Sequence, residues 1–185
     1  MPPQTSAALQ LARLVGAGAL WATTRTPEKG DRLRREGLAD EVIVAAEAQE
    51  IARALGARTG GRGADVILDF VGGPYLEANV ALAAPGGRIV TLSYLGGARG
   101  TLPFGALLFK RLTLVGTTLR GRPIEEKMVL TQRFRREVLP HVASGRIRPV
   151  LDRVVRLEEI AKAHRWMEEN RTFGKIAVRV GREEE

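Results

Sequence analysis

Residues 60–73 read GGRGADVILDFVGG, and this stretch decides the fold class. A glycine-rich loop precedes an apolar run at residues 64–70, and a Gly-Gly turn follows it. An apolar run of this length between turn signals is typical of a strand buried on both faces, as in a parallel sheet covered by helices. Ligands bind beyond the carboxyl ends of such strands, so the turn at residues 70–73 is a candidate site.

Strand candidates alternate with helical patterns on both sides of this stretch, joined by short turns. Such alternation indicates a doubly wound α/β sheet. The expected strands are residues 19–23, 41–45, 64–70, 88–93 and 112–119, and the expected helices are residues 5–15, 26–37, 47–57, 74–84 and 104–110.

Beyond Gly121 the pattern changes. We expect a long helix at residues 123–143, an extended segment at 149–155, a helix at 157–170 and a strand at 175–180. The last two extended segments have no evident place in the parallel sheet.

The composition is that of an ordinary globular protein, with 44% hydrophobic and 27% charged residues. The absence of cysteine excludes disulfides and thiolate metal sites. Because His141 and His164 are the only histidines, we predict no metal site. No apolar run approaches the roughly 18 residues of a membrane span, and the N-terminus does not read as a signal peptide. A cytoplasmic protein with no membrane partner is therefore expected.

The net charge is +8, with 24 arginines against five lysines. An excess of positive charge makes nucleic acid a candidate partner, because basic side chains bind phosphates. The arginines are scattered, however, and no expected helix is basic along one whole face, as a dedicated nucleic-acid binder would be. Nucleic acid is therefore an alternative partner that is not favoured.

The glycine fingerprint for dinucleotide phosphates requires a strand, then glycines, then a helix. Gly16 and Gly18 end a helix instead of opening one, and residues 60–63 precede a strand. Residues 2–4 read PPQ at the start of the first helix, where the glycines would stand. The fingerprint is therefore missing from the chain.

A basic, hydroxyl-rich turn at residues 23–29, TTRTPEK, follows a strand candidate and opens a helix. Hydroxyls, a guanidinium, an ammonium and free helix amides suit a phosphate dianion. A cofactor with only a ribose hydroxyl would favour an acid at the strand end, and none is present. If a dinucleotide binds, it should be NADPH. The alternative is an ordinary helix cap surrounded by surface charges.

Asp69 ends the central apolar run, and no histidine or second acid is close to it in the sequence. We therefore expect its carboxylate to hydrogen-bond the following turn, and we assign no catalytic residue. Tyr94, beside a second glycine pair, either faces a ligand or packs.

The chain resembles the carboxyl-terminal part of the medium-chain dehydrogenase/reductase superfamily, in particular its zinc-independent NADPH:quinone oxidoreductases. The similarity covers nearly the whole chain. It rests on the order and spacing of SAALQLA (6–12), TPEK (26–29), DVILDFVGG (65–73), GGRIV (86–90), LRGR (119–122), PVLDRV (149–154) and GKIAV (174–178).

The resemblance implies a Rossmann-like NADPH-binding domain at residues 1–145. It also implies that residues 146–185 join a GroES-like catalytic domain, which lies outside this chain. Family members transfer a hydride to a quinone or an activated alkene (enone), and they dimerise through an edge strand, here residues 112–119, starting at Leu112. The implied 2′-phosphate contacts are Thr24, Arg25, Thr26 and Lys29, and the other implied cofactor contacts are Phe70, Val71, Gly72, Tyr94, Leu95, Gly96, Thr117, Thr118 and Leu119.

The departures from the family concern the first strand, its glycine loop and the catalytic domain, none of which this sequence contains. In the usual Rossmann strand order 3-2-1-4-5-6 the first strand is central. We expect either that the strands at residues 19–23 and 64–70 close directly on each other, or that another chain fills the place between them. The strands at 149–155 and 175–180 should lie on exposed edges or pair with a neighbour. Ile43 and Val44 replace a polar or aromatic pair that contacts adenosine in the family.

Function is thus expected to be that of an NADPH-dependent quinone or enone reductase, impaired in this chain because the catalytic domain is absent. The alternatives are a non-catalytic module that binds a nucleotide or single-stranded RNA and, with less support, a generic Rossmann protein such as a methyltransferase.

Overall fold

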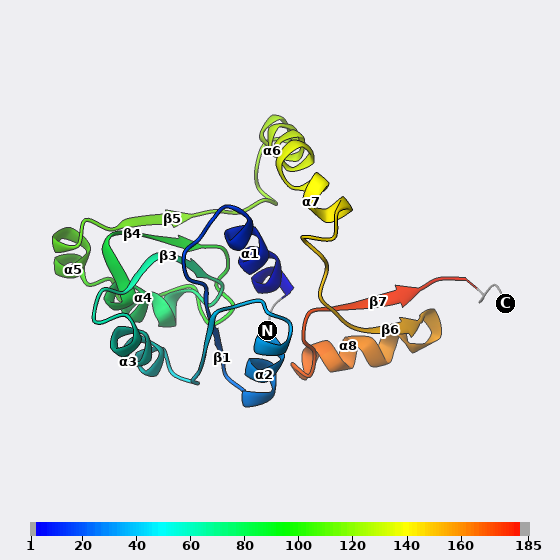
Figure 1. Ribbon diagram of the computed structural model, residues 1–185, viewed down its shortest axis with the longest axis horizontal. Helices are drawn as coiled ribbons and strands as arrows, with labels where there is room; N and C mark the ends of the chain where they lie inside the picture. Colours follow the sequence, from blue (N-terminus) through cyan, green and yellow to red (C-terminus); the bar gives the residue numbers. More distant parts are fainter. Residues whose placement is uncertain (1–2, 182–185) are drawn as a thin grey trace. The chain divides into compact units, whose positions relative to one another are not determined.

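The computed structural model describes residues 3–181. By packing, the chain divides into two compact units (Figure 1). Unit 1 consists of Met1–Val42 and Arg133–Glu185, and unit 2 of Ile43–Gln132. The predicted division after residue 145 follows the family's domain organisation and stays a prediction.

Unit 2 is built on a parallel sheet of three strands in the order β3-β4-β5. The strands are β3 (Ala64–Asp69), β4 (Ala83–Thr91) and β5 (Thr113–Gly116). The helices are α3 (Ala48–Arg58), the short 3-10 helix η1 (Gly73–Tyr75), α4 (Leu76–Leu82) and α5 (Phe104–Phe109).

Helices α3 and α4 contact each other and lie on one side of this sheet (Figure 1). The core on that side contains Val80, Ala83 and Ile89, with Ile67 packed against them. On β3, Val66 and Leu68 point to the other face, and they are 61% and 41% exposed. The prediction that β3 is buried on both faces is therefore wrong for this unit, since only one face carries the α3–α4 layer.

Strand β4 begins five residues earlier than expected and includes residues 85–87, PGG, which typically form a turn and lie between the expected helix and the expected strand. The pairing moves from Ala64↔Ala83 to Val66↔Arg88, so β4 uses three more residues than β3 over this step. Gly86 adopts a φ of 76° there, a conformation that glycine reaches without strain. The turn signal in the sequence thus marks a β-bulge.

In unit 1, helices α1 (Pro3–Leu14) and α2 (Pro27–Arg35) accompany β1 (Trp21–Thr24), which pairs with β2 (Glu41–Val44). The boundary between the units falls within β2. Residues from both parts of unit 1 form one apolar core, which consists of Leu9, Leu20, Ala22, Leu33, Leu38, Ala39, Val42, Val150 and Phe173.

The expected helix at residues 123–143 is two helices, α6 (Ile124–Glu137) and α7 (Leu139–Ala143). Pro140 explains the break, because it has no amide to donate and disfavours a helical conformation in the residue before it. The remaining elements are β6 (Leu151–Arg156), η2 (Leu157–Glu159), α8 (Ile160–Glu168) and β7 (Lys175–Arg179).

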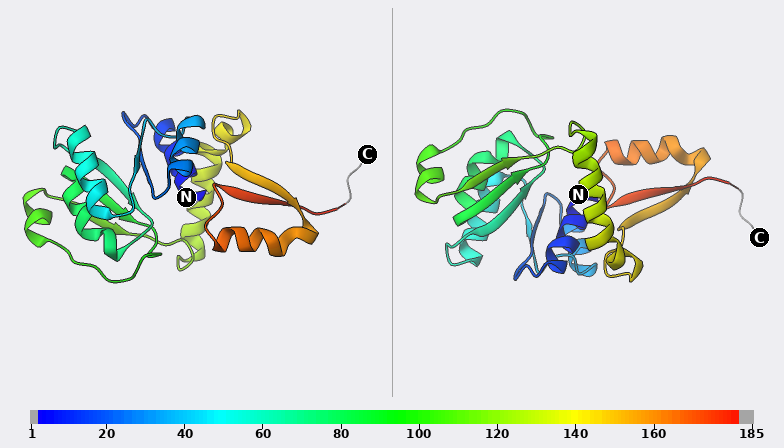
Figure 2. Two further views of the ribbon diagram at one scale, coloured as in Figure 1. Left: turned by 90° about the horizontal axis from the view of Figure 1, so that it is seen from below. Right: turned by 90° about the horizontal axis from the view of Figure 1, so that it is seen from above.

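Strands β6 and β7 pair with each other in parallel, and α8 is the crossover that lies along them (Figure 2). The prediction that these strands lie on edges or pair with a neighbour is confirmed. No described helix is long and apolar enough to cross a membrane.

Strands β1 and β2 form one sheet, and strands β3, β4 and β5 form another, each accompanied by helices. The predicted Rossmann-like α/β fold is confirmed. Strands β1 and β3 belong to different units, so direct closure of the strands at residues 19–23 and 64–70 stays a prediction. A strand from another chain stays a prediction.

The outer edge of β3 should be detectable by hydrogen exchange. The carbonyl of Asp69 accepts from the amide of Leu92 at 2.8 Å, so Asp69 and Ile67 direct their backbone groups toward β4. Val66 and Leu68 alternate with these two residues along β3, so their backbone amides and carbonyls face the outer edge. We expect fast amide exchange at Val66 and Leu68 and protection at Ile67 and Asp69, measured by NMR. Equal protection at all four would show that another strand covers this edge.

Candidate functional site

The turn after β3 and the turn after β4 are bonded to each other in unit 2. The amide of Gly96 donates to the carbonyl of Val71 at 2.8 Å, and the amide of Gly73 donates to the carbonyl of Gly97 at 3.0 Å. Gly72 is buried between the two turns with a φ of 90°, and a Cβ there would lie 2.7 Å from the Cα of Tyr94. The predicted contacts at 70–72 and 94–96 are therefore brought together.

Asp69 organises the first of these turns. Its Oδ1 atom accepts hydrogen bonds from the amides of Val71 at 2.8 Å and Gly72 at 3.0 Å. The predicted structural role of this carboxylate is confirmed. Its other oxygen, Oδ2, is buried and has no hydrogen-bond partner among the described residues.

The third predicted segment, residues 117–119, follows β5 at the same edge of the sheet. The amide of Thr117 donates to the carbonyl of Thr91 on β4 at 3.1 Å. Arg122 holds the segment from the other side, because its guanidinium donates to the Thr117 hydroxyl at 2.9 Å and to the Thr118 carbonyl at 3.0 Å. Since β3, β4 and β5 are parallel, all three segments leave the sheet at its carboxyl edge.

Three side chains at this edge are exposed: Tyr94, Leu95 and Leu119 are 71%, 78% and 58% exposed. The question of whether Tyr94 packs is thereby settled, because most of its ring is accessible. An aromatic and two aliphatic side chains beside a glycine turn offer apolar walls to a planar ligand.

In unit 1, the basic turn at Thr24, Arg25 and Thr26 joins β1 to α2. Thr26 occupies the N-cap position, but its side chain makes no capping hydrogen bond. The expected cap is therefore wrong, and the first-turn amides of α2 are left without a side-chain acceptor. Pro27 is the first residue of this helix, where its missing amide costs nothing. An uncapped helix start beside Arg25 is electrostatically suited to an anion.

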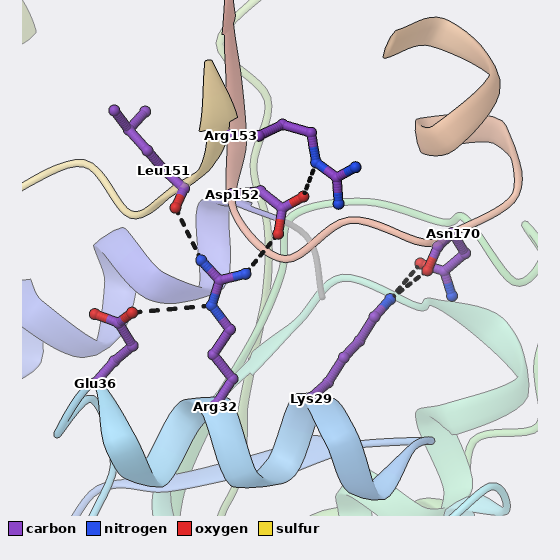
Figure 3. Close-up of polar contacts among 7 residues, drawn as sticks. All are labelled: Lys29, Arg32, Glu36, Leu151, Asp152, Arg153 and Asn170. Atoms are coloured by element: carbon purple, nitrogen blue, oxygen red, sulfur yellow. Dashed lines mark hydrogen bonds and ion pairs between the residues drawn. The ribbon is translucent and has the colours of Figure 1, made fainter. Parts of the chain in front are cut away.

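Lys29, the remaining predicted phosphate contact, has a protein partner. Its ammonium donates to the main-chain carbonyl of Asn170 at 2.6 Å and to the side-chain oxygen of the same residue at 2.8 Å (Figure 3). Asn170 follows the end of α8. No local pattern in the sequence indicates this contact, because 141 residues separate the partners.

Three residues after Lys29, about one turn along α2, Arg32 binds Asp152 at 2.5 Å and the carbonyl of Leu151 at 2.8 Å (Figure 3). Its guanidinium also stacks on the ring of Phe173, 4.7 Å from the centroid. The Asp152 side chain is only 6% exposed. Burial opposes its ionisation, but hydrogen bonds from Arg153, Arg32 and the Phe173 amide together hold the pKa of this carboxyl below its ordinary value.

The predicted contacts thus fall into two groups, each within one unit. Unit 1 holds the turn at residues 24–26 and Lys29, and unit 2 holds the segments 70–72, 94–96 and 117–119. No cluster of three or more potential metal ligands occurs in the part of the chain that the structure describes.

Known proteins of similar sequence are named as a reducing polyketide synthase, an oxidoreductase-like protein and a reductase. A highly reducing polyketide synthase of Cordyceps militaris is 34% identical over 96% of this chain, which spans 7% of that protein. Quinone oxidoreductase-like protein 2 of Bos taurus is 32% identical over 68% of this chain and 36% of its own length. Acryloyl-coenzyme A reductase of Sulfurisphaera tokodaii is 28% identical over 93% of this chain and 46% of its own length. The chain therefore spans less than half of these relatives.

Among solved structures, the crotonyl-CoA carboxylase/reductase AntE in complex with NADP superimposes with a TM-score of 0.75. It is 25% identical over 95% of this chain, which covers 46% of AntE. The sequence profile of the zinc-binding dehydrogenases matches residues 39–178, well over half of the chain. Together with the Rossmann-like fold, this match establishes that the chain belongs to the zinc-binding dehydrogenase family, within the medium-chain dehydrogenase/reductase superfamily.

Proposed function

We propose that this chain is the NADPH-binding portion of an oxidoreductase that reduces a quinone or an activated alkene. The observation that carries the proposal is the uncapped N-terminus of α2 behind a turn of two threonines and an arginine. A 2′-phosphate would satisfy the free amides and the guanidinium together, whereas the ribose hydroxyl of NADH would favour an acid there.

The residues present fit the cofactor in two places. In unit 1, Thr24, Arg25, Thr26 and Lys29 would hold the 2′-phosphate. In unit 2, the turns at residues 70–72 and 94–96 would contribute the other cofactor contacts, and Gly72 and Gly96 let these two turns pack closely against each other. The glycine loop that cradles the pyrophosphate in Rossmann folds is not part of this sequence.

The bound cofactor would supply a hydride to the electron-poor carbon of an alkene or to a quinone. The residues of this chain would orient it: the exposed side chains of Tyr94, Leu95 and Leu119 would flank the nicotinamide, and Arg122 would hold residues 117 and 118 in place. Relatives named as an acryloyl-coenzyme A reductase and as a quinone oxidoreductase-like protein support this substrate class.

The chain spans less than half of these relatives, and in the family a catalytic domain, no part of which this chain resembles, would complete the substrate pocket. We therefore propose that residues 1–185 alone turn over substrate weakly or not at all. The rate of NADPH oxidation with a soluble quinone measures this directly.

We further propose a homodimer that forms through β5. Among the described residues 3–181, β5 pairs with β4 and with no second strand, so a second copy could pair along its outer edge. Leu114 and Val115 on it are 41% and 36% exposed. An edge with exposed apolar side chains is a favourable template for strand pairing between copies.

A calorimetric titration with NADPH and NADH tests the cofactor proposal. We expect the chain to prefer NADPH, and Arg25→Ala to weaken NADPH binding by roughly tenfold or more while leaving NADH unchanged, since a charge-assisted hydrogen bond contributes about 1.5–3 kcal/mol. Arg35→Ala, at the other end of α2, is the control and should change neither affinity. Equal affinities of the unmodified chain for both cofactors would refute the 2′-phosphate assignment.

A further inference from the structure

We propose that Asn170 is a positioning residue that determines cofactor specificity by holding the ammonium of Lys29 beside the 2′-phosphate turn. The inference rests on the proposed function, because it concerns how unit 1 recognises NADPH. It assigns a role to the segment after α8, which the sequence does not place near the phosphate turn.

Asn170 is held rigidly by the way α8 ends. Its φ is 55°, its amide donates to the carbonyl of Met167 at 3.0 Å, and the amide of Arg171 donates to the carbonyl of Trp166 at 2.9 Å. This pair of bonds is the Schellman motif, in which asparagine is one of the few residues that tolerate the left-handed position. The motif fixes the backbone of Asn170, including the carbonyl that accepts from Lys29, and sets the position from which the side-chain oxygen reaches the same ammonium.

The other end of the segment is also anchored. The amide of Lys175 donates to the carbonyl of Val150 at 2.8 Å, and Gly174, with a φ of 89°, fits closely against the backbone of Val150. Phe173 is buried in the core of unit 1 beneath the guanidinium of Arg32. The segment 170–175 is therefore a fixed surface against which α2 rests.

Lys29 is the third residue of α2, within the first turn and three positions after Thr26. An ammonium has three protons to donate, and Asn170 accepts two of them. One proton remains for a phosphate oxygen. Because both acceptors on Asn170 are uncharged, they orient the ammonium and leave its full charge available to an anion.

The test compares NADPH and NADH affinities of two variants by calorimetry. Asn170→Asp places a carboxylate on the ammonium and should weaken NADPH binding by about tenfold, with NADH unchanged. Asn170→Gly keeps the positive φ but removes the side-chain oxygen, and should reduce the preference for NADPH by about threefold. In a Lys29→Ala background neither change should alter the preference further.

Arg111→Gly is the matched control, because Arg111 in unit 2 has nearly the same φ, 54°, and this change should not alter the preference. The fluorescence of Trp166, on α8, reports whether each Asn170 variant is folded. If the unmodified chain prefers NADPH and both Asn170 variants behave like it, or Asn170→Gly binds NADPH more tightly, this inference alone is overturned. If the unmodified chain does not prefer NADPH, the proposed cofactor and this inference fall together.

Discussion

Replacing Gly72 by alanine is expected to lower the free energy of unfolding of unit 2 by about 4 kcal/mol. A positive φ costs a non-glycine residue about 1–2 kcal/mol, and forced overlap in a packed site costs about 1–3 kcal/mol more. Both penalties apply, since the φ is 90° and the new Cβ would lie 2.7 Å from the Cα of Tyr94 and 2.9 Å from the carbonyl oxygen of Gly97.

Gly61→Ala is the matched control for this change. Gly61 also has a positive φ, 81°, but nothing lies within 4 Å of the position that its Cβ would take. The Gly61→Ala variant should lose only the free energy that the positive φ costs an alanine, about 1–2 kcal/mol. Urea denaturation followed by circular dichroism measures both, and NMR exchange at the amides of Gly73 and Gly96 shows whether the two turns separate. Similar losses for the two variants would mean that the close approach to Tyr94 is unimportant.

Asp152→Asn is expected to destabilise unit 1 by about 2–3 kcal/mol. Removing one partner of a buried ion pair typically costs about 3–5 kcal/mol. We expect a loss somewhat below this range because the Arg32 side chain is 26% exposed and can reach water, whereas the Asp152 side chain is 6% exposed. Both tryptophans, Trp21 and Trp166, are in unit 1, so tryptophan fluorescence during denaturation reports this unit selectively.

The effect of Asp152→Asn should depend on pH in a defined direction. The pKa of Asp152 is lowered in the folded protein. The ionised carboxylate therefore stabilises the fold fully at any pH above its pKa in the unfolded chain, which is about 4. This contribution is lost as the pH falls through the folded pKa. The difference between the unmodified chain and the variant should therefore be constant from about pH 7 to pH 5 and shrink below about pH 4.

Asp65→Asn provides the comparison, since Asp65 makes an equivalent pair with Arg62 whose side chains are 63% and 65% exposed. Exposed pairs contribute about 0–1 kcal/mol, so this variant should unfold almost like the unmodified chain. A loss at Asp152 no larger than that at Asp65 would show that the contacts of Arg32 do not hold α2 in place.

Much of the fold was readable from local patterns. The apolar run at residues 64–70, the glycine turn after it and the alternation of strands with helices each depend on neighbours in the sequence. All five expected strands up to residue 119 are present, with ends shifted by a few residues. The sequence also indicated the role of Asp69, because a carboxylate at a strand end can reach the amides of the next turn.

What the local patterns could not show are features set by distant partners. The residues 85–87 read as a turn, but pairing with β3 turns them into a bulge. Thr26 reads as a helix cap, but its hydroxyl makes no capping bond. Lys29 reads as a phosphate ligand, and only packing against the end of α8 shows that Asn170 binds its ammonium.

By itself, then, the sequence determined the fold class, the order of the strands along the chain and the residues that form each turn. Backbone periodicity and turn chemistry are local properties. Tertiary structure alone decided that β3 pairs with β4, that the turns after β3 and β4 are bonded to each other, and that α2 rests on Asn170 and Asp152. These depend on which surfaces meet after folding, and residues more than 100 positions apart carry no periodic signal of their pairing.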